Sequence, residues 1–409
     1  MRSVLIVGAG QSGLHLALGL LKNGYEVTVV TGRTPEEMRS GGVTSSQAMF
    51  GTALACERAI GLDGWPDCPP IEGIHLSVPG PDGGRAIDWA ARLDTPARSV
   101  DQRLKMPAWL EEVDRLGGKV VVHEATPADL EEYAARHDLV LVATGKGRLG
   151  SLFGRDAARS PYDSPQRALA LTYVHGLRPR PEHSAVCFNL VPGVGEYFVF
   201  PALTLSGPCE IMVFEGVPGG PMDCWGEVRT PAEHLAMSRR ILETFLPWEA
   251  ERASGVELTD AKGVLTGRFS PTVRRPVAVL PSGAAVLGVA DVLVLNDPIT
   301  GQGANNAAKC AAAYLEAILA HGERPFTPEW MTDAFERYWS QAGHATAWTN
   351  ALLAPPPPHV LEILGAAGTL PEVAARFVNG FDDPADYAEW FMDPAKARAY
   401  LDDVRRAAA

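Results

Sequence analysis

The first apolar run of the chain, residues 4–7, predicts a buried strand, and a glycine-containing turn leads from it into a helix-forming stretch over 15–21. Short apolar runs continue to alternate with amphipathic stretches through the first 145 residues. Strands are predicted over 26–30, 119–123 and 138–145, and helices over 48–60, 101–117 and 127–136. Strands that alternate with helices in this way predict a parallel sheet of the α/β class.

A second pattern has period two. Residues 71–89 alternate around a turn at 79–84, which predicts a hairpin inserted between the early elements. Aromatic and β-branched residues then predict strands over 168–174, 184–190, 195–201 and 210–214, before a helix over 231–245. Gly/Pro turns between these strands favour a mainly antiparallel sheet.

The last third is helical, with a stiff spacer at Pro355–Pro358. Helices are predicted over 304–320, 328–348, 359–367, 371–378, 384–391 and 394–408. Trp339, Trp348, Trp390 and Phe391 are expected to pack this region onto the sheet. Its outer surface is a candidate for a homodimer contact or for another protein partner, and the sequence leaves that choice open.

Composition excludes several classes of function. The 409 residues carry a net charge of -13, which argues against nucleic acid or an anionic membrane as a partner. No apolar run reaches the roughly 20 residues of a membrane span, and the first residues do not resemble a signal peptide. The six cysteines are scattered without C-x-x-C spacing, so reduced thiols in the cytoplasm and no metal site are expected.

The turn after the first strand has the spacing G-x-G-x-x-G, with Gly8, Gly10 and Gly13 around Gln11 and Ser12. The first glycine permits the tight turn, the second admits a pyrophosphate, and the third lets helix and strand pack closely. A dinucleotide on the helix N-terminus is therefore predicted.

Three neighbouring features bear on how that nucleotide is held. The usual acidic residue after the second strand is replaced by Thr31-Gly32-Arg33, which predicts affinity weaker by about 1.5–3 kcal/mol and a nucleotide that exchanges. The Thr144-Gly145 turn would let backbone lie against the cofactor. Arg103, in the first turn of a helix capped by Asp101, indicates an anionic partner such as phosphate, with a plain surface arginine as the alternative.

A second motif lies about 290 residues further on, where a strand runs into Asp291 and then into the turn Pro298-Ile-Thr-Gly301-Gln302-Gly303-Ala304-Asn305. The aspartate would accept from a ribityl hydroxyl. The helix N-terminus after the turn would favour negative charge on a reduced flavin ring by about 0.3–2 kcal/mol. The two glycine motifs therefore serve opposite ends of one FAD. Phe188, Phe198, Phe200 and Phe214, on the predicted strands, are candidates for a substrate pocket, with plain core as the alternative.

Together these motifs resemble the FAD-dependent aromatic hydroxylase superfamily, and most closely the oxygenase component of two-component styrene and indole monooxygenases. The resemblance rests on residues 29–37, 96–104, 164–168, 297–305 and 346–350 and covers nearly the whole chain. It implies a Rossmann-type FAD-binding domain of the glutathione-reductase type (1–70, 95–165 and 275–325), an inserted, mainly antiparallel substrate domain (71–94 and 166–274) and a helical cap (326–409).

The resemblance also implies a reaction. Such enzymes take reduced FAD from a separate NADH-dependent flavin reductase, add O2 at the flavin C4a carbon, and pass an electrophilic oxygen from this (hydro)peroxide to styrene-like alkenes or indole. The Asp-Gly motif linked with NAD(P)H use in one-component hydroxylases has no match after Gly145. A one-component NAD(P)H-dependent hydroxylase and a non-catalytic FAD carrier remain the alternatives.

Roles carried over from the family place the pyrophosphate at the first glycine motif, the FAD phosphate region at Arg103 and the ribityl chain at Asp291. The turn from Pro298 to Ala304, with Gly301 and Gln302, would face the flavin ring. Two departures are visible. Ala290 replaces the usual glycine before the aspartate, and Ser45, with Gln47 nearby, stands where the family has an asparagine near the flavin. Ser45 or Ser46 as a helix cap in an ordinary loop is the alternative. The histidines need no catalytic role.

Overall fold

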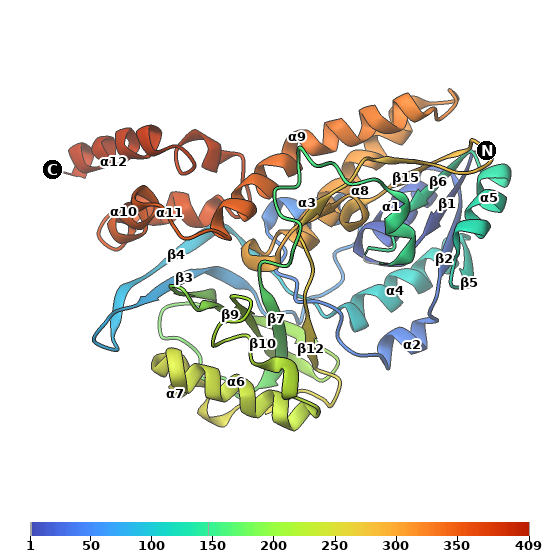
Figure 1. Ribbon diagram of the computed structural model, residues 1–409. Coiled ribbons are helices and arrows are strands. Elements are labelled where there is room, and N and C mark those ends of the chain that lie inside the picture. Colours follow the sequence, from blue (N-terminus) through green and yellow to red (C-terminus); the bar gives the residue numbers. More distant parts are fainter. Residues whose placement is uncertain (1, 146, 409) are drawn as a thin grey trace.

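The apolar run at the start of the chain forms β1 (Ser3–Val7), near the centre of a six-stranded sheet. In this computed structural model, which describes residues 2–145 and 147–408, the strand order is β14-β15-β6-β1-β2-β5 (Figure 1). The other strands are β2 (Glu26–Thr31), β5 (Lys119–Val122), β6 (Leu139–Val142), β14 (Val277–Val279) and β15 (Ala285–Gly288). All pairs are parallel except the edge pair β14–β15, so the predicted parallel sheet is confirmed.

Helix α1 (Gln11–Lys22) packs between α4 (Gln102–Arg115) and α8 (Gln302–His321). Its apolar side chains, Leu14 and Leu18 among them, are fully buried. Asp101 caps α4, as predicted, because its Oδ1 accepts the backbone N–H of Arg103 at 2.8 Å. Smaller helices complete this half: α2 (Pro35–Arg39), α3 (Gly51–Ala59), α5 (Pro127–Arg136) and the 3-10 turn η1 (Arg148–Leu152).

The second sheet has the order β11-β7-β10-β9-β8-β3-β4, with β12 also paired to β7. Its pairs are antiparallel except β3–β8, which confirms the mainly antiparallel prediction. The strands are β3 (Ile71–Pro79), β4 (Arg85–Ala97), β7 (Ala168–His175), β8 (Ala185–Val191), β9 (Gly195–Thr204), β10 (Gly207–Gly216), β11 (Glu257–Leu258) and β12 (Val264–Gly267). A short pair, β13 (Thr272–Val273) and β16 (Val294–Leu295), leads toward the second motif.

This second sheet is covered on both faces. One face packs on α6 (Pro231–Phe245) and α7 (Pro247–Arg252), and the other packs on the C-terminal helices (Figure 1). Side chains alternate between the faces along each strand. The C-terminal helices are α9 (Pro328–Leu352), α10 (Pro358–Ala367), α11 (Pro371–Asn379) and α12 (Pro394–Ala408), and the remaining 3-10 turns are η2 (Trp225–Glu227), η3 (Ala253–Gly255), η4 (Ala290–Val292), η5 (Pro298–Thr300) and η6 (Asp386–Glu389).

Two predicted helices differ from the structure. The helix predicted over 384–391 is only the turn η6, because Tyr387, Trp390 and Phe391 are all drawn into the core. The Tyr387 hydroxyl donates to Phe377 O, and the Trp390 indole donates to Asp386. The helix predicted from residue 48 begins at Gly51.

Within the described chain, no helix combines the length and apolar character needed to cross a membrane.

A buried histidine on α1 predicts how stability depends on pH. Burial, and then the charge of Lys105, lower the pKa of His15 to about 4. Because this folded value lies below the usual 6.5, the unfolded chain binds more protons between pH 6.5 and 4, and stability falls as the pH falls through that window. The pKa shift of His15 alone is expected to lower the free energy of unfolding by about 3 kcal/mol at the lower end of that pH window. Urea unfolding of the parent and of His15→Phe at several pH values measures it, and equal pH slopes would contradict the assignment.

Candidate active site

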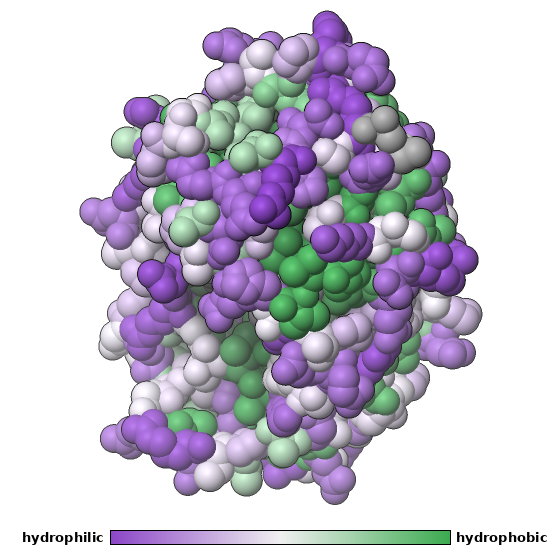
Figure 2. All heavy atoms as spheres, turned by 90° about the vertical axis from the view of Figure 1, so that its right-hand side faces the viewer, coloured by the Kyte–Doolittle hydropathy of each residue, from purple (hydrophilic) through white to green (hydrophobic). Residues whose placement is uncertain are grey.

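A single cavity of about 1130 Å³ runs between the two sheets. It reaches from the glycine turn after β1 to aromatic side chains of the second sheet. Figure 2 shows the face of the molecule on the side of the first sheet, where apolar side chains gather near the middle of a largely polar surface. Pockets for single small molecules have volumes of about 300–1,000 Å³, so this cavity has room for a dinucleotide and a second molecule.

The dinucleotide motif lies at one end of the cavity. Gly8, Gly10, Gln11 and Ser12 line it, and Gly10 is the N-cap residue of α1, which has no acidic residue in its first turn. A Cβ at Gly10 would meet no heavy atom of the described chain within 4 Å, so the position opens into the cavity. A Cβ at Gly8 would lie 2.4 Å from Ala143 O, and one at Gly13 would lie 2.2 Å from Gly8 O. Free helix N–H groups beside open space fit a pyrophosphate.

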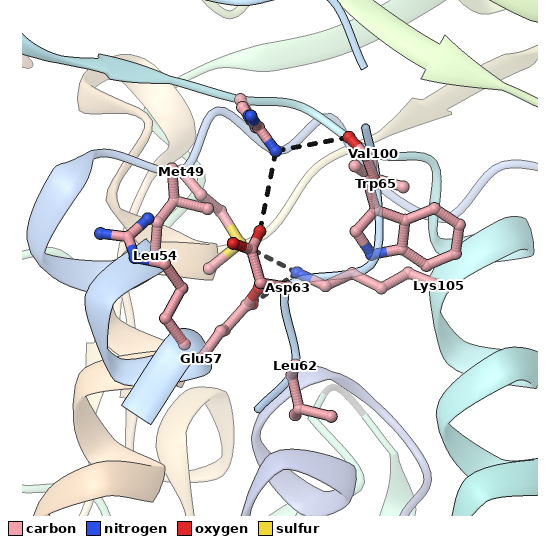
Figure 3. A pocket seen from close by; sticks show the side chains of 10 residues that line it. Met49, Leu54, Glu57, Leu62, Asp63, Trp65, Val100 and Lys105 are labelled. Atoms are coloured by element: carbon pink, nitrogen blue, oxygen red, sulfur yellow. Dashed lines mark hydrogen bonds and ion pairs between the residues drawn. The ribbon is translucent and has the colours of Figure 1, made fainter. Parts of the chain in front are cut away.

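A buried ion pair supports this helix from behind. Lys105 on α4 pairs with Glu57 on α3 (Figure 3). The Gln11 amide also donates to Glu57 Oε1, at 2.6 Å. Burial lowers the pKa of Lys105, while the Glu57 carboxylate opposes that shift. The Gln11 side chain is therefore held in the fold, and Gln11 faces the cavity mainly through its backbone. The adjoining hollow of about 20 Å³ has room for about one water molecule.

The carboxyl ends of β2 and β5 lie side by side at the edge of the first sheet that faces the cavity. Thr31 and Arg33 line the cavity there, together with His123 and Glu124. An ideal Cβ at Gly32 would lie 3.8 Å from the Glu124 Cβ, so this carboxylate stands beside the position where an acidic residue is missing. Glu124 was not predicted as a site residue. The signal for it was its place just after a parallel strand, because the carboxyl ends of parallel strands share one edge.

The middle of the cavity is formed by the turns after β6 and β15. Thr144, Gly145 and Asp291 line it, and an ideal Cβ at Gly145 would lie 4.0 Å from the Asp291 Cβ. Ala290 has φ +49°, the only positive φ at a non-glycine position of the described chain. The resemblance predicts a glycine at this position, and a Cβ there strains the backbone.

Replacing Ala290 with Gly is therefore expected to stabilise the protein. The left-handed conformation costs an alanine about 1–2 kcal/mol, and the extra chain entropy of glycine offsets part of that gain. A net gain of about 1 kcal/mol in the free energy of unfolding is expected, measured by urea denaturation. A loss of stability in Ala290→Gly would show that this backbone is unstrained.

The second motif lies across from Asp291. Pro298, Gly301, Gly303 and Ala304 line the cavity, and Gly301, with φ +64°, is the N-cap residue of α8. Cβ atoms at Gly301 and Gly303 would meet no heavy atom of the described chain within 4 Å. This turn and the free N-terminus of a 20-residue helix fit the edge of a planar, electron-rich ring.

Two polar side chains of this motif point elsewhere, against the expectation. The Gln302 amide donates to Phe381 O at 2.9 Å, and Gln302 is fully buried outside the cavity lining. The Asn305 amide donates to Ala48 O at 2.9 Å, and its Oδ1 accepts the N–H of Phe50 at 2.8 Å. A catalytic role for the Gln302 side chain is therefore wrong, because the helix turns both amides toward neighbouring loops.

In the loop before α3, one of the two predicted residues lines the cavity and the side chain of the other does not. Ser45 lines the cavity, and its backbone carbonyl accepts the Tyr173 hydroxyl at 2.9 Å. Gln47 is buried, and its amide donates to Val100 O at 2.6 Å, so its side chain lies outside the cavity lining. The helix-cap alternative for Ser45 or Ser46 is also wrong, because Phe50 precedes the first turn of α3.

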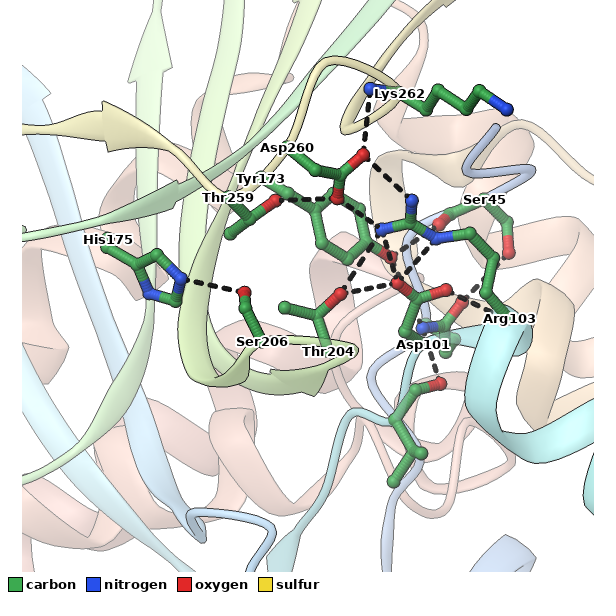
Figure 4. Close-up of polar contacts among 12 residues, drawn as sticks. Ser45, Asp101, Arg103, Tyr173, His175, Thr204, Ser206, Thr259, Asp260 and Lys262 are labelled. Carbon is green, nitrogen blue, oxygen red and sulfur yellow. Dashed lines mark hydrogen bonds and ion pairs between the residues drawn. The ribbon is translucent and has the colours of Figure 1, made fainter. Parts of the chain in front are cut away.

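Arg103 has its anionic partners inside the protein (Figure 4). Its guanidinium donates to Asp101 Oδ2 at 2.8 and 2.9 Å and to both oxygens of Asp260 at 3.0 Å. Thr204 on β9 also accepts from it, at 3.2 Å. The side chain is only 3% exposed, and its carboxylate partners join α4 to the second sheet. Arg103 also lines the cavity, so the phosphate contact stays a prediction.

Three of the four predicted phenylalanines line the far end of the cavity: Phe188, Phe198 and Phe200. The rings of Phe188 and Phe198 stack with centroids 4.6 Å apart. Phe214 is a wrong prediction. It packs with Tyr197 and Trp225 on the opposite face, because neighbouring residues of a strand alternate and β10 turns Val213 and Glu215 toward the cavity.

Known proteins resemble this chain along almost its full length. A family model described as the substrate binding domain of styrene monooxygenase A matches residues 145–252. Styrene monooxygenase StyA of Pseudomonas fluorescens is 30% identical over 400 residues, which cover 96% of this chain and 95% of the relative. The chain belongs to the styrene monooxygenase family. A second styrene monooxygenase StyA, from a Pseudomonas species, is 30% identical over 401 residues with the same coverage.

Solved structures share the fold of this styrene monooxygenase family member at low identity. The flavin-dependent brominase Bmp2 superposes with a TM-score of 0.65 at 12% identity, covering 99% of both chains. The 2-methyl-3-hydroxypyridine-5-carboxylic acid oxygenase superposes with a TM-score of 0.57 at 15% identity, covering 92% of this chain and 93% of the other. The predicted α/β flavoprotein fold is thereby confirmed.

Membership of this family also confirms the predicted class of activity. The protein is an FAD-dependent monooxygenase, with FAD and O2 as cosubstrates. It is the oxygenase component of a two-component system, which takes reduced FAD from a separate flavin reductase.

Proposed function

We propose that this monooxygenase epoxidises small aromatic alkenes of the styrene or indole type, with FAD lying along the cavity. The continuity of the cavity carries the proposal, since one space is lined by Gly10 at one end and by Phe198 at the other. The pyrophosphate would lie on the N-terminus of α1, and Asp291 would accept from the ribityl chain. Glu124 would take the role of the missing acidic residue at the adenosine ribose.

The flavin ring would lie against the turn from Pro298 to Ala304, where the N-terminus of α8 favours negative charge by about 0.3–2 kcal/mol. Reduced FAD and O2 together supply the electrophilic oxygen. The residues of this chain then have to orient the alkene and exclude water, because water would divert the oxidant to hydrogen peroxide. The stacked pair Phe188 and Phe198, with Phe200, provides the apolar wall for that task.

The reductase in this proposal uses NADH and works as a separate protein. All six cysteines are free, which supports a reducing, cytoplasmic setting.

The test mixes the protein anaerobically with reduced FAD, adds O2, and follows absorbance by stopped flow with and without styrene or indole. A long-lived oxygenated flavin spectrum that decays with formation of epoxide or indigo is expected. Immediate reoxidation to free FAD and peroxide under every condition would overturn the proposal. Addition of NAD(P)H alone, which is expected to leave bound FAD oxidised, separates a one-component hydroxylase.

A further inference from the structure

One side of the aromatic pocket is polar. Glu215 lines the cavity at the end of β10 and is fully buried, and Asp297, just before the turn of the second motif, is 1% exposed. Glu196, opposite Glu215 on β9, and Arg167 are also buried. Three carboxyl groups and one guanidinium therefore meet beside the phenylalanines.

Arg167 is committed to one of the three acids. Its Nε and Nη2 donate to the two oxygens of Glu196 at 2.7 and 2.9 Å. Glu215 has no N–H or O–H donor from another side chain of the described residues, and its hydrogen bond is with the Asp297 carboxyl. Two carboxyl groups form such a bond only when one of them carries a proton.

The environment assigns that proton to Glu215. Burial, and then the nearby carboxyls of Asp297 and Glu196, raise the pKa of Glu215 well above its usual range. A neutral Glu215 that donates its O–H to Asp297 keeps its carbonyl oxygen as an acceptor. Two acids this close to each other in a buried site are expected to share one proton rather than ionise together.

A second polar group at the same wall points to a ligand. Asn296 lines the cavity and is 7% exposed, and its Oδ1 accepts from the Thr346 hydroxyl at 3.0 Å. Its Nδ2 has no hydrogen-bond partner among the described residues. A buried amide donor without a partner is unfavourable, so a ligand atom that accepts a hydrogen bond at this wall would relieve that cost.

We propose that Glu215, held by Asp297, accepts a hydrogen bond from an N–H or O–H group on the aromatic substrate and so determines specificity. The inference rests on the proposed function and narrows its substrate class to aromatic alkenes that carry such a donor. A bare hydrocarbon of the same shape would leave the carbonyl oxygen of Glu215 without a partner.

Indole and indene test this directly, because they have the same shape and differ only in N–H against CH2. Their dissociation constants are measured by titrating the full-length enzyme, loaded with oxidised FAD, and following flavin fluorescence. Indole is expected to bind at least about tenfold more tightly than indene. Equal affinities would overturn the proposal.

Two variants of the same residue sharpen the test. Glu215→Gln keeps an amide donor toward Asp297 and a carbonyl oxygen toward the ligand, so it should retain the preference for indole within about threefold. Glu215→Met removes both and should abolish the preference, with indene binding unchanged or tighter. Glu210→Gln, on the same strand but outside the cavity lining, is the matched control and should bind both ligands as the parent does.

The ratio of the indole and indene dissociation constants tests the Glu215 contact, and the formation of epoxide tests the proposed function. Formation of any epoxide from styrene or indene with reduced FAD supports the proposed function, whatever the ratio is. A parent enzyme that prefers indole but oxidises no alkene would overturn the proposed function and leave the Glu215 contact standing. An indole preference that survives in Glu215→Met would overturn the contact. If the Met variant does not fold, the ratios of the parent and of Glu215→Gln still decide.

Discussion

Arg103→Met is expected to destabilise the protein by about 3–5 kcal/mol, because it leaves Asp101 buried without its cation. Asp101 is 1% exposed, and the guanidinium is its charge-compensating partner at 2.8 Å. The same substitution also releases Asp260 from the clamp between α4 and the second sheet. Urea unfolding at pH 7, followed by tryptophan fluorescence, measures the loss.

The control for this prediction is an arginine at the surface. Arg39 pairs with Glu111 at 2.6 Å, but the two side chains are 37% and 50% exposed. Arg39→Met should therefore change the free energy of unfolding by less than about 1 kcal/mol. If Arg103→Met were as stable as the parent and only bound FAD more weakly, the clamp would be contradicted and the phosphate role predicted from the sequence would be supported.

Gly13→Ala is expected to cost about 3 kcal/mol or more, and the protein will fold poorly if the backbone cannot shift. The added Cβ would lie 2.2 Å from the Gly8 carbonyl oxygen and 3.3 Å from the Ala143 Cβ. Gly8 lies in the turn between β1 and α1, and Ala143 lies at the end of β6. Relief of either close contact would require a strand to move. Thermal unfolding and expression yield measure the effect.

Gly10→Ala is the matched control in the same motif. Its Cβ would meet no heavy atom of the described chain within 4 Å, so stability should change by less than about 1 kcal/mol. The methyl group would instead stand where a pyrophosphate approaches, and FAD affinity should fall more than tenfold in a fluorescence titration. The reverse result, with Gly10→Ala unstable and Gly13→Ala weak in FAD binding, would exchange the two roles.

The two glycine motifs were predictable because each depends on short stretches of chain. A glycine that must adopt φ +64°, as at Gly301, or that must admit a neighbouring backbone, as at Gly13, is constrained by residues close to it in sequence or by one adjacent strand. Period and turn residues likewise predicted α5 and α6 to within a residue at each end. Local geometry and hydrophobic period carry that information.

The errors have a different origin. The sequence shows the position of Arg103 on a helix but not its partner Asp260, 157 residues away, which only the second sheet brings beside it. Phe214 was assigned to the pocket because its residue type fitted, but the face that a strand turns inward depends on the register of its neighbours. Glu124 was not predicted for a similar reason, because the residues beside it depend on the order of the strands in the first sheet.

The sequence by itself determined the α/β class, the parallel and antiparallel sheets, the two motifs for an FAD and the family, because these follow from periodicity and from glycines at set spacings. Only the tertiary structure decided which polar side chains face the cavity. It turns Gln47, Gln302 and Asn305 into the protein and brings Glu215 to Asp297 beside the phenylalanines. The physical reason is that a side chain's partner, and with it a carboxyl group's proton, depends on contacts between segments far apart in the chain.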